Sequence, residues 1–306
     1  MSEKKLCFEQ VHIDVARNST DDFNPFHDPQ RWQRIKDNPF TSPIALGFQL
    51  EFLAADRIAA NRRLSGHDRL VADHQLHYSN YEFMFTGALH AGEAFAVEIK
   101  KTVDKTGSDG SLSTRAVLRK GDGSLVLMGN QSETRQPRFL ADAVLHGLPS
   151  LEHLPDRIIA PGTRYFLKRK FLNTSNGKNF ALAALCDQRD YFDELDERID
   201  FPPLFTAALL SSALLERGWA AGYDFEADPL VYTRHQISVD NRLQRQLRSN
   251  DRLHILVEGP LAPPSQKGLG GSTVEQQLYR CFGLLHGQQI LFRANVQLAP
   301  LHGFLS

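Results

Sequence analysis

The chain has 306 residues, 42% of them hydrophobic and 23% charged, and its 35 basic and 36 acidic side chains leave a formal net charge of −1 at pH 7. This composition excludes a disordered or fibrous protein. A chain of this length buries about three quarters of its unfolded surface and predicts about two domains, or one duplicated domain. The lack of a basic excess argues against nucleic-acid binding.

Targeting and metal-binding signals are missing from the sequence. The first ten residues contain charges but no apolar segment of the kind that signal peptides have, and the most apolar stretch, residues 204–215, is too short to span a bilayer. Cys7, Cys186 and Cys281 lack the spacing of a zinc site and suit a reducing compartment. We therefore expect a cytoplasmic protein that binds no membrane, no metal and no cofactor.

The first half of the chain predicts one long helix followed by antiparallel strands. A Ser-Pro pair at 42–43 is typical of a helix N-cap and first turn, and the apolar pattern continues to about residue 63, before Gly66. Alternating apolar residues at 95, 97 and 99 predict a strand with one buried face. Residues 116–128, with Lys-Gly-Asp-Gly at their centre, predict a hairpin.

The second half repeats this order of elements. A helix is predicted from Pro202-Pro203 to Gly218, a strand at residues 253–257, and a hairpin at residues 278–296 that turns at His286-Gly287. Proline and glycine residues between positions 137 and 155 punctuate the chain and indicate a boundary. We therefore expect two repeats, residues 1–150 and 151–306.

A weak internal similarity supports the duplication. The string His74–Asn80 resembles the string His235–Asn241, and each is followed by a strand pattern and a hairpin. Both predicted helices are apolar on nearly all sides, which indicates a helix covered by more than one layer. The expected fold class is α+β, with an antiparallel sheet wrapped around a central helix in each repeat.

The segment that carries chemistry lies before the first long helix. Asp22 and His27 are separated by five positions across Asn24-Pro25, and the residue before a proline is held out of the helical conformation. The chain therefore bends, so that a carboxylate and an imidazole face one pocket as an acid/base pair. Gly47 allows a substrate to approach the backbone near the helix N-terminus, where free N–H groups stabilise an oxyanion.

Each of these residues also has a purely structural interpretation. Asp22 is typical of a turn in which the carboxylate binds the backbone two residues on. His27 fits an exposed position before a short helix, and Gly47 fits a site that relieves close packing of helix and sheet.

The sequence from Asp22 to His27, Asp-Phe-Asn-Pro-Phe-His, resembles the D-x-N-P-[LIV]-H signature of the MaoC-like, or (R)-specific enoyl-CoA hydratase, family. Residues 42–47, Ser-Pro-Ile-Ala-Leu-Gly, are similar to the P-I-A-H-G segment of that family. The resemblance implies a tandem, or double, hotdog fold. It also implies hydration of a trans-2-enoyl thioester, or dehydration of an (R)-3-hydroxyacyl thioester, in fatty acid metabolism.

The resemblance also implies roles for individual residues. Asp22 and His27 would be the catalytic pair that holds and activates water, Asn24 would support them by hydrogen bonding, and Gly47 would donate its backbone N–H to the thioester carbonyl. The implied partner is an acyl-CoA or acyl carrier protein thioester, no cofactor is implied, and the chain would act as a monomer or homodimer.

The sequence departs from the family pattern at three places. Asp21 stands where the family has glycine, and a second carboxylate beside Asp22 is expected to raise the pKa of one of the two. Leu46 stands where the family has histidine, and Trp32-Gln33 follows where small residues are common.

The second half lacks the acid/base pair. When Asn179 is aligned with Asn24, Gly177 falls at the aspartate position and Leu182 at the histidine position. The second repeat would then shape an acyl tunnel. Two other functions stay open, a non-catalytic acyl-thioester-binding protein and a hotdog thioesterase. A polyketide-type dehydratase ranks lower, because it needs an aspartate in the second repeat.

Other patterns are assigned structural roles. His74 and His77 fall in a strand pattern without a third metal ligand, and Cys186 and Cys281 suit the core. The acidic run at 190–200 lacks the order of an EF-hand, and the glycines at 268–271 favour a loop over a dinucleotide site.

Overall fold

The computed structural model describes residues 5–143, 145, 147–262 and 276–304. Within them, twelve strands form one antiparallel sheet in the order β1-β3-β5-β6-β2-β11-β14-β13-β12-β8-β7, with β4 paired to β5. The strands of the first half are β1 (Leu6–Cys7), β2 (Tyr78–Phe85), β3 (Ala94–Ile99), β4 (Val103–Lys105), β5 (Ser111–Lys120) and β6 (Leu125–Thr134). Those of the second half are β7 (Ile158–Ile159), β8 (Phe166–Phe171), β11 (Leu230–Asp240), β12 (Arg252–Leu261), β13 (Gln277–Leu285) and β14 (Gln289–Pro300).

The remaining elements are helices and a small separate sheet. The helices are α1 (Gln10–Thr20), α2 (Gly47–Ser65), α3 (Asp68–Asp73), α4 (Thr174–Ala183), α5 (Pro203–Ala208), α6 (Leu210–Ala220), α7 (Asn241–Gln244) and α8 (Leu301–Phe304). The 3-10 turns are η1 (Pro25–His27), η2 (Trp32–Arg34), η3 (Gln188–Asp190) and η4 (Glu194–Asp196). The short strands β9 (Phe192–Asp193) and β10 (Arg198–Ile199) pair with each other.

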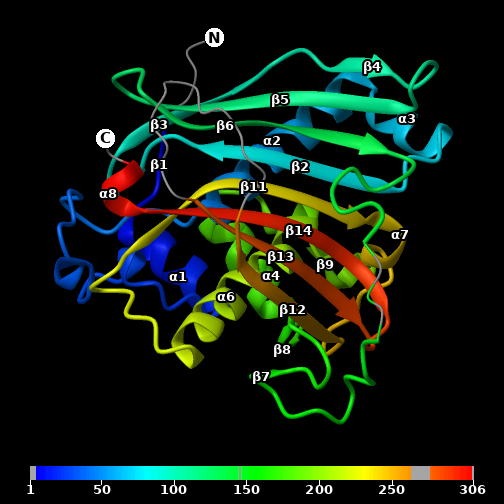
Figure 1. The fold of residues 1–306 in the computed structure, drawn as a ribbon. Helices are drawn as coiled ribbons and strands as arrows, with labels where there is room; N and C mark the ends of the chain where they lie inside the picture. Colours follow the sequence, from blue (N-terminus) through cyan, green and yellow to red (C-terminus); the bar gives the residue numbers. More distant parts are fainter. Residues whose placement is uncertain (1–4, 144, 146, 263–275, 305–306) are drawn as a thin grey trace.

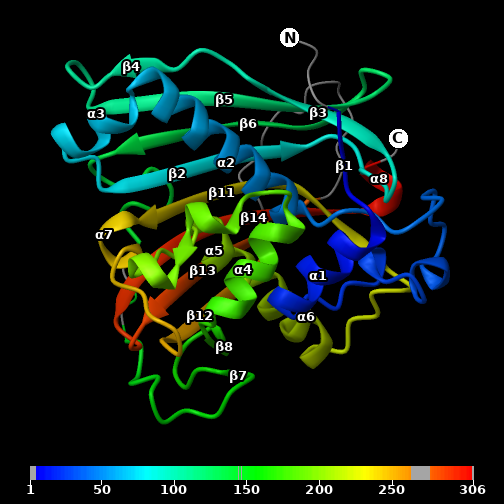
Figure 2. The same cartoon turned by 180° about the vertical axis from the view of Figure 1, so that it is seen from behind.

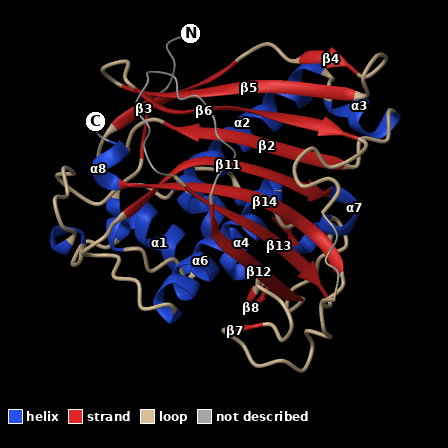
Figure 3. Cartoon of the chain, viewed as in Figure 1, coloured by secondary structure: helices blue, strands red, loops and turns tan. Residues whose placement is uncertain are grey.

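The large sheet curves around a layer of helices on one face, as opposite views of the molecule show (Figures 1 and 2). Helix α2 contacts β3, β5 and β6, whereas α6 contacts β8 and β12, so each half wraps its own helix in strands, as predicted (Figure 3). The halves join where β2 pairs with β11, and there Ser238 donates its hydroxyl hydrogen to Asn80 Oδ1 at 2.7 Å. The core lies between the layers and includes Phe48, Phe52 and Leu53 of α2, each at most 2% exposed.

The first long helix begins later than predicted. Residues before Gly47 are extended, because Ile44 forms a β-bridge with His90 and the Ala45 N–H donates to the Leu89 carbonyl. The predicted end is confirmed, because Gly66 follows α2 in the left-handed conformation with φ of 73°.

The prediction of a second long helix that runs without a break and stops at Gly218 is wrong. The helix is divided at Leu209 into α5 and α6, and hydroxyl groups bond back to nearby carbonyls on both sides of the break: Thr206 to Pro203 at 2.8 Å, and Ser212 to Leu209 at 2.9 Å. Such back-bonding bends helices. The helix also passes through Gly218, where an added Cβ would lie only 2.7 Å from a ring carbon of Phe225.

The predicted strands and hairpins are confirmed. The residues at 95–99 lie in β3 and those at 253–257 in β12, and the hairpins turn between β5 and β6 and between β13 and β14. The prediction of one buried face does not hold for β12, because its second face is also covered. On that face, Leu256 packs with Leu151 and Leu167 under the segment that connects the two halves. The division at residue 150 stays a prediction.

The internal string similarity does not mark equivalent positions. His74 caps the end of α3 and His77 precedes β2, so neither lies in a strand, whereas His235 lies inside β11. Cys186 and Cys281 are buried, and Cys7 is intermediate, with all three thiols free. The glycines at 268–271 lie outside the described residues. None of the described helices combines the length and the apolarity that a bilayer crossing requires.

Candidate active site

The end of α1 separates the two neighbouring carboxylates. Asp21 adopts a left-handed conformation with φ of 54°, and the Asp22 N–H then donates to the Arg17 carbonyl at 2.9 Å. This turn directs Asp21 outward, where its side chain is 75% exposed and pairs with Lys170 at 2.5 Å, while Asp22 is only 5% exposed. The extra carboxylate therefore points away from the site, and a lysine of the second half compensates its charge.

Two consecutive turns bring His27 back toward Asp22. The Asn24 N–H donates to Asp22 Oδ1 at 2.9 Å, and the Phe26 N–H donates to Asn24 Oδ1 at 3.1 Å, which caps the 3-10 turn η1. These are Asx turns, as the structural interpretation of Asp22 expected. The same turns bury His27, which is 5% exposed and not at the surface.

The tautomer of His27 follows from its hydrogen bond. Its Nδ1 lies 2.8 Å from the Ile44 carbonyl oxygen, and because a carbonyl only accepts, Nδ1 carries the proton and Nε2 stays free. Burial lowers the pKa of His27, and the charge of Asp22 and the bond to Ile44 partly offset this effect. His27 is therefore a neutral imidazole at pH 7, with a basic nitrogen.

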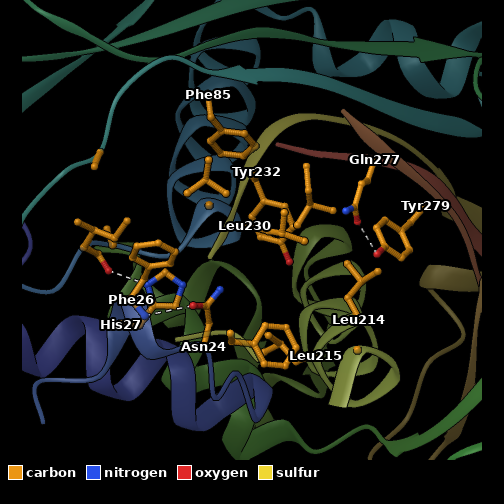
Figure 4. Close-up of a pocket in the computed structure, with 18 of the residues that line it drawn as sticks. Asn24, Phe26, His27, Phe85, Leu214, Leu215, Leu230, Tyr232, Gln277 and Tyr279 are labelled. Atoms are coloured by element: carbon orange, nitrogen blue, oxygen red, sulfur yellow. Dashed lines mark hydrogen bonds between the residues drawn. The ribbon is translucent and has the colours of Figure 1, made fainter. Parts of the chain in front are cut away.

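His27 opens onto a cavity of about 280 Å³. Asn24 and Gly47 line the same cavity, together with apolar side chains from both halves that include Phe85 and Leu214 (Figure 4). The structure thus brings together three of the four predicted site residues at one cavity. Asp22 is not among the lining residues, but it lies near enough to His27 for its charge to raise the pKa of the imidazole.

Gly47 is the first residue of α2, so its N–H is one of the groups without an acceptor inside the helix. An added Cβ would lie 3.0 Å from Phe85 ring carbons and 3.3 Å from Tyr232 Cδ2. The glycine therefore allows two rings to pack over the helix N-terminus, as its structural interpretation expected. Its backbone also lines the cavity. Leu46, where the family has histidine, is 2% exposed and belongs to the core.

No protein-family model matches the chain, and no curated protein matches its sequence significantly. Among solved structures, a MaoC-like dehydratase is similar with a TM-score of 0.57 and 12% identity, over 98% of this chain and 96% of that one. A MaoC domain dehydratase from Chloroflexus aurantiacus gives a TM-score of 0.57 and 11% identity, over 97% and 93% of the two chains. A conserved hypothetical protein of Mycobacterium tuberculosis, described as having a double hotdog fold, gives a TM-score of 0.55 and 8% identity, over 98% of this chain and 94% of that one.

The chain has the double hotdog fold. This confirms the predicted fold class. At such identities the likeness establishes the fold and not the activity.

The double hotdog also shows which residues of the two halves correspond. Asn179 lies inside α4, which packs on α1, whereas Asn24 lies in the turn after α1, so the alignment of Asn179 with Asn24 pairs unlike elements. After α4, Leu185 is left-handed and the Cys186 N–H donates to the Ala181 carbonyl, just as the Asp22 N–H donates five residues back after α1.

Cys186 therefore occupies the place of Asp22 in the second half of the double hotdog. Asp190, the last residue of η3, occupies the place of His27, the last residue of η1. The second half therefore carries a thiol and a carboxylate where the first carries a carboxylate and an imidazole. That the second half has no catalytic pair of its own stays a prediction.

The sequence did not indicate two groups beside the site. Tyr232 of β11 lines the cavity and shares a hydrogen bond of 3.1 Å with the Ser211 hydroxyl, and burial together with the charge of Asp22 raises the pKa of this tyrosine. Behind it, Glu51 and His235 are fully buried with 3.0 Å between Oε1 and Nδ1, and burial raises the pKa of Glu51. In the sequence, only the position of Glu51, one helical turn after Gly47, could have indicated that it lies near the site.

Metal chemistry finds no support in the described part of the chain. No group of three or more His, Cys, Asp or Glu side chains there is arranged to hold a metal ion.

Proposed function

We propose that the protein adds water to trans-2-enoyl thioesters of CoA or acyl carrier protein, or removes water from (R)-3-hydroxyacyl thioesters. The observation that carries this proposal is the neutral, buried imidazole of His27, with Nε2 free at a cavity that the N-terminus of α2 also lines. The fold shared with structures named as MaoC-like dehydratases supports the choice of reaction.

In the proposed hydration, His27 acts first as the base and then as the acid. His27 Nε2 takes a proton from water as the water oxygen bonds to the β-carbon of the enoyl group. The electron pair of the double bond moves toward the thioester carbonyl, whose developing negative charge the Gly47 N–H stabilises. The imidazolium, stabilised by the charge of Asp22, then gives its proton to the α-carbon. The product is the 3-hydroxyacyl thioester, and His27 is neutral again.

The cavity suits an acyl group because most of its wall is apolar. The first half of the chain contributes Phe26, Phe85 and Leu89 to the lining, and the second half contributes Leu214 and Leu298. Apolar walls also exclude bulk water, which strengthens the interaction between a helix N-terminus and an enolate-like oxygen.

The test is an assay of purified protein with enoyl-CoA and enoyl-carrier-protein substrates of several chain lengths. Loss of the ultraviolet absorbance of the conjugated thioester reports hydration, and chiral analysis of the product reports its configuration. His27→Ala is expected to slow the reaction by roughly 10²–10⁴-fold, and Asp22→Asn is expected to slow it by removing the charge that stabilises the imidazolium. His67→Gln, at a half-exposed histidine bonded to Ser65, serves as the control.

One observation favours a second candidate function, non-catalytic binding of acyl thioesters. Asp22 commits Oδ1 to the Asn24 N–H and does not line the cavity. A binding protein would be stabilised by acyl-CoA without forming product, and Asp22→Asn would bind as tightly as the wild type. Absence of turnover at every chain length, with stabilisation retained, would replace the hydratase proposal by this one, whereas release of free thiol would indicate a thioesterase.

A further inference from the structure

Among the described residues, the side chain of one arginine in the cavity wall has neither an ion pair nor a hydrogen bond. Arg217 lies in the last turn of α6 and lines the cavity, and its Nε is buried without a hydrogen bond. Among the described residues, every other arginine that is at least partly buried makes an ion pair or a hydrogen bond. Examples are Arg62, 2.8 Å from Glu133, and Arg169, which donates to the Leu154 carbonyl at 2.7 Å.

The contact that holds Arg217 leaves its donors unused. Its Cζ lies 5.9 Å from the centroid of the Tyr279 ring. A cation–π contact attracts the charge of the guanidinium to the ring face and does not pair its N–H groups with an acceptor atom. The side chain is therefore positioned for a planar acceptor that the described residues do not supply.

A second donor lies beside it. The Tyr279 hydroxyl donates to Gln277 Oε1 at 3.0 Å, which leaves the Gln277 amide nitrogen as a donor. Both residues line the cavity, and Figure 4 shows them at the end opposite His27. The cavity thus has a basic group near each end, His27 at one and Arg217, which contacts the Tyr279 ring, at the other. Figure 4 shows Phe85, Tyr232 and Leu230 between the two ends.

No carboxylate is present among the described residues that line the cavity, so none of them neutralises Arg217 there. Glu258 of the neighbouring strand β12 instead pairs with Arg164 at 2.6 Å. A neutral acyl chain would cover the guanidinium without replacing its lost contact with water, which is unfavourable. A carboxylate, in contrast, accepts two parallel N–H bonds from an arginine.

We propose that Arg217 binds a carboxylate at the far end of the acyl group, with Gln277 as a second donor. The substrate would then be the monothioester of an unsaturated dicarboxylic acid, or the corresponding hydroxy acid in the reverse direction. This proposal rests on the proposed function, because the same cavity must hold the thioester at its His27 end. The phosphates of CoA fit less well, because a solvated polyanion needs several cations at a rim, whereas Arg217 is a single charge set into the wall.

The test compares two thioesters that differ only in a terminal carboxylate, trans-2-hexenedioyl-CoA (thioester at C1) and trans-2-hexenoyl-CoA. The wild type is expected to prefer the first in kcat/KM by at least about tenfold, because a site built around a charged group discriminates strongly against an analogue that lacks it. Arg217→Met should abolish the preference, so that the ratio of the two kcat/KM values falls to about one, because the carboxylate contact is removed. Arg217→Lys should retain part of the preference. Arg245→Gln, at an exposed arginine of the α7 terminus, is the matched control and should keep all of it.

A binding measurement separates this proposal from the hydratase proposal. Calorimetry with the saturated, unreactive adipyl-CoA and hexanoyl-CoA should show the same preference in the wild type and its loss in Arg217→Met, whether or not the protein is a hydratase. If Arg217→Met loses affinity equally for both ligands, Arg217 binds a CoA phosphate. If it loses affinity for neither ligand, Arg217 contacts no part of them. Each of these two results overturns the proposal. Absence of turnover with a carboxylate-dependent affinity would instead refute only the hydratase function.

Discussion

Replacing Gly47 by alanine separates the two roles of this residue. The added methyl group would lie 3.0 Å from Cε1 and Cζ of Phe85 and 3.3 Å from Cδ2 of Tyr232, so these rings must shift by a few tenths of an ångström. Both rings line the cavity and have space into which they can move. The substitution should therefore be tolerated by the fold but should narrow the cavity at the helix N-terminus.

The expected free energies follow from these contacts. Crowding in a packed core costs about 1–3 kcal/mol when the neighbours cannot move, and replacing glycine by alanine recovers about 0.4–1 kcal/mol by restricting the unfolded chain. With Phe85 free to move, we expect the free energy of unfolding to change by no more than about 1 kcal/mol. Displacement of groups at a reacting centre is costly to the rate, so the kcat/KM of the proposed hydratase should fall roughly tenfold.

Gly129→Ala provides the contrast. Its Cβ would lie 2.1 Å from the Glu82 carbonyl oxygen and 2.7 Å from Phe83 Cα. This backbone belongs to β2, which is paired on both sides with β6 and β11 and cannot retreat. We expect a loss of at least about 3 kcal/mol, measured by urea unfolding followed by circular dichroism. The reasoning is refuted if Gly47→Ala unfolds as easily as Gly129→Ala, or if it leaves kcat/KM unchanged.

Three further predictions concern charge. Arg62→Met should destabilise the fold by about 3–5 kcal/mol in urea unfolding, because Glu133 stays buried without its cation, and adding Glu133→Gln should restore part of the loss. Burial lowers the pKa of His254 to about 4 and also lowers the pKa of His27, so the unfolded chain binds more protons than the folded chain at acidic pH. The urea midpoint of unfolding should therefore fall as the pH drops from about 6.5 to 4. His254→Gln should make this fall shallower, and an unchanged dependence of the midpoint on pH would contradict the prediction. For the proposed hydratase, kcat/KM should decrease as His27 protonates, below the ordinary histidine pKa.

Much of the candidate site could be predicted from sequence because it is local. The bend between Asp22 and His27 depends on Asx turns and on one proline, and all of these interactions span at most three residues. The stop at Gly66 is local in the same sense, since it needs only a left-handed glycine. Local hydrogen bonding of this kind is readable from residue types alone.

Three of the failures involve contacts beyond the immediate sequence neighbours. Gly218 reads as a helix stop, yet it lies inside α6 because Phe225 packs where a side chain would be. Helix α2 begins four residues late because Ile44 is captured by a bridge to His90, which lies 46 residues further on. The correspondence of Cys186 with Asp22 was missed because it depends on the packing of α4 against α1, not on similar residue types.

The cavity also explains why the two halves are not interchangeable units. The proposed acid/base residue His27 and the helix N-terminus at Gly47 come from the first half, whereas Arg217, Tyr232 and Tyr279 come from the second. The second half contributes no histidine to the described lining, but it supplies apolar wall that an acyl group would contact in the proposed function. A duplicated fold that kept two complete sites would need each half to satisfy both requirements. Here each half meets one of them, so binding and chemistry at this cavity require both halves in one sheet.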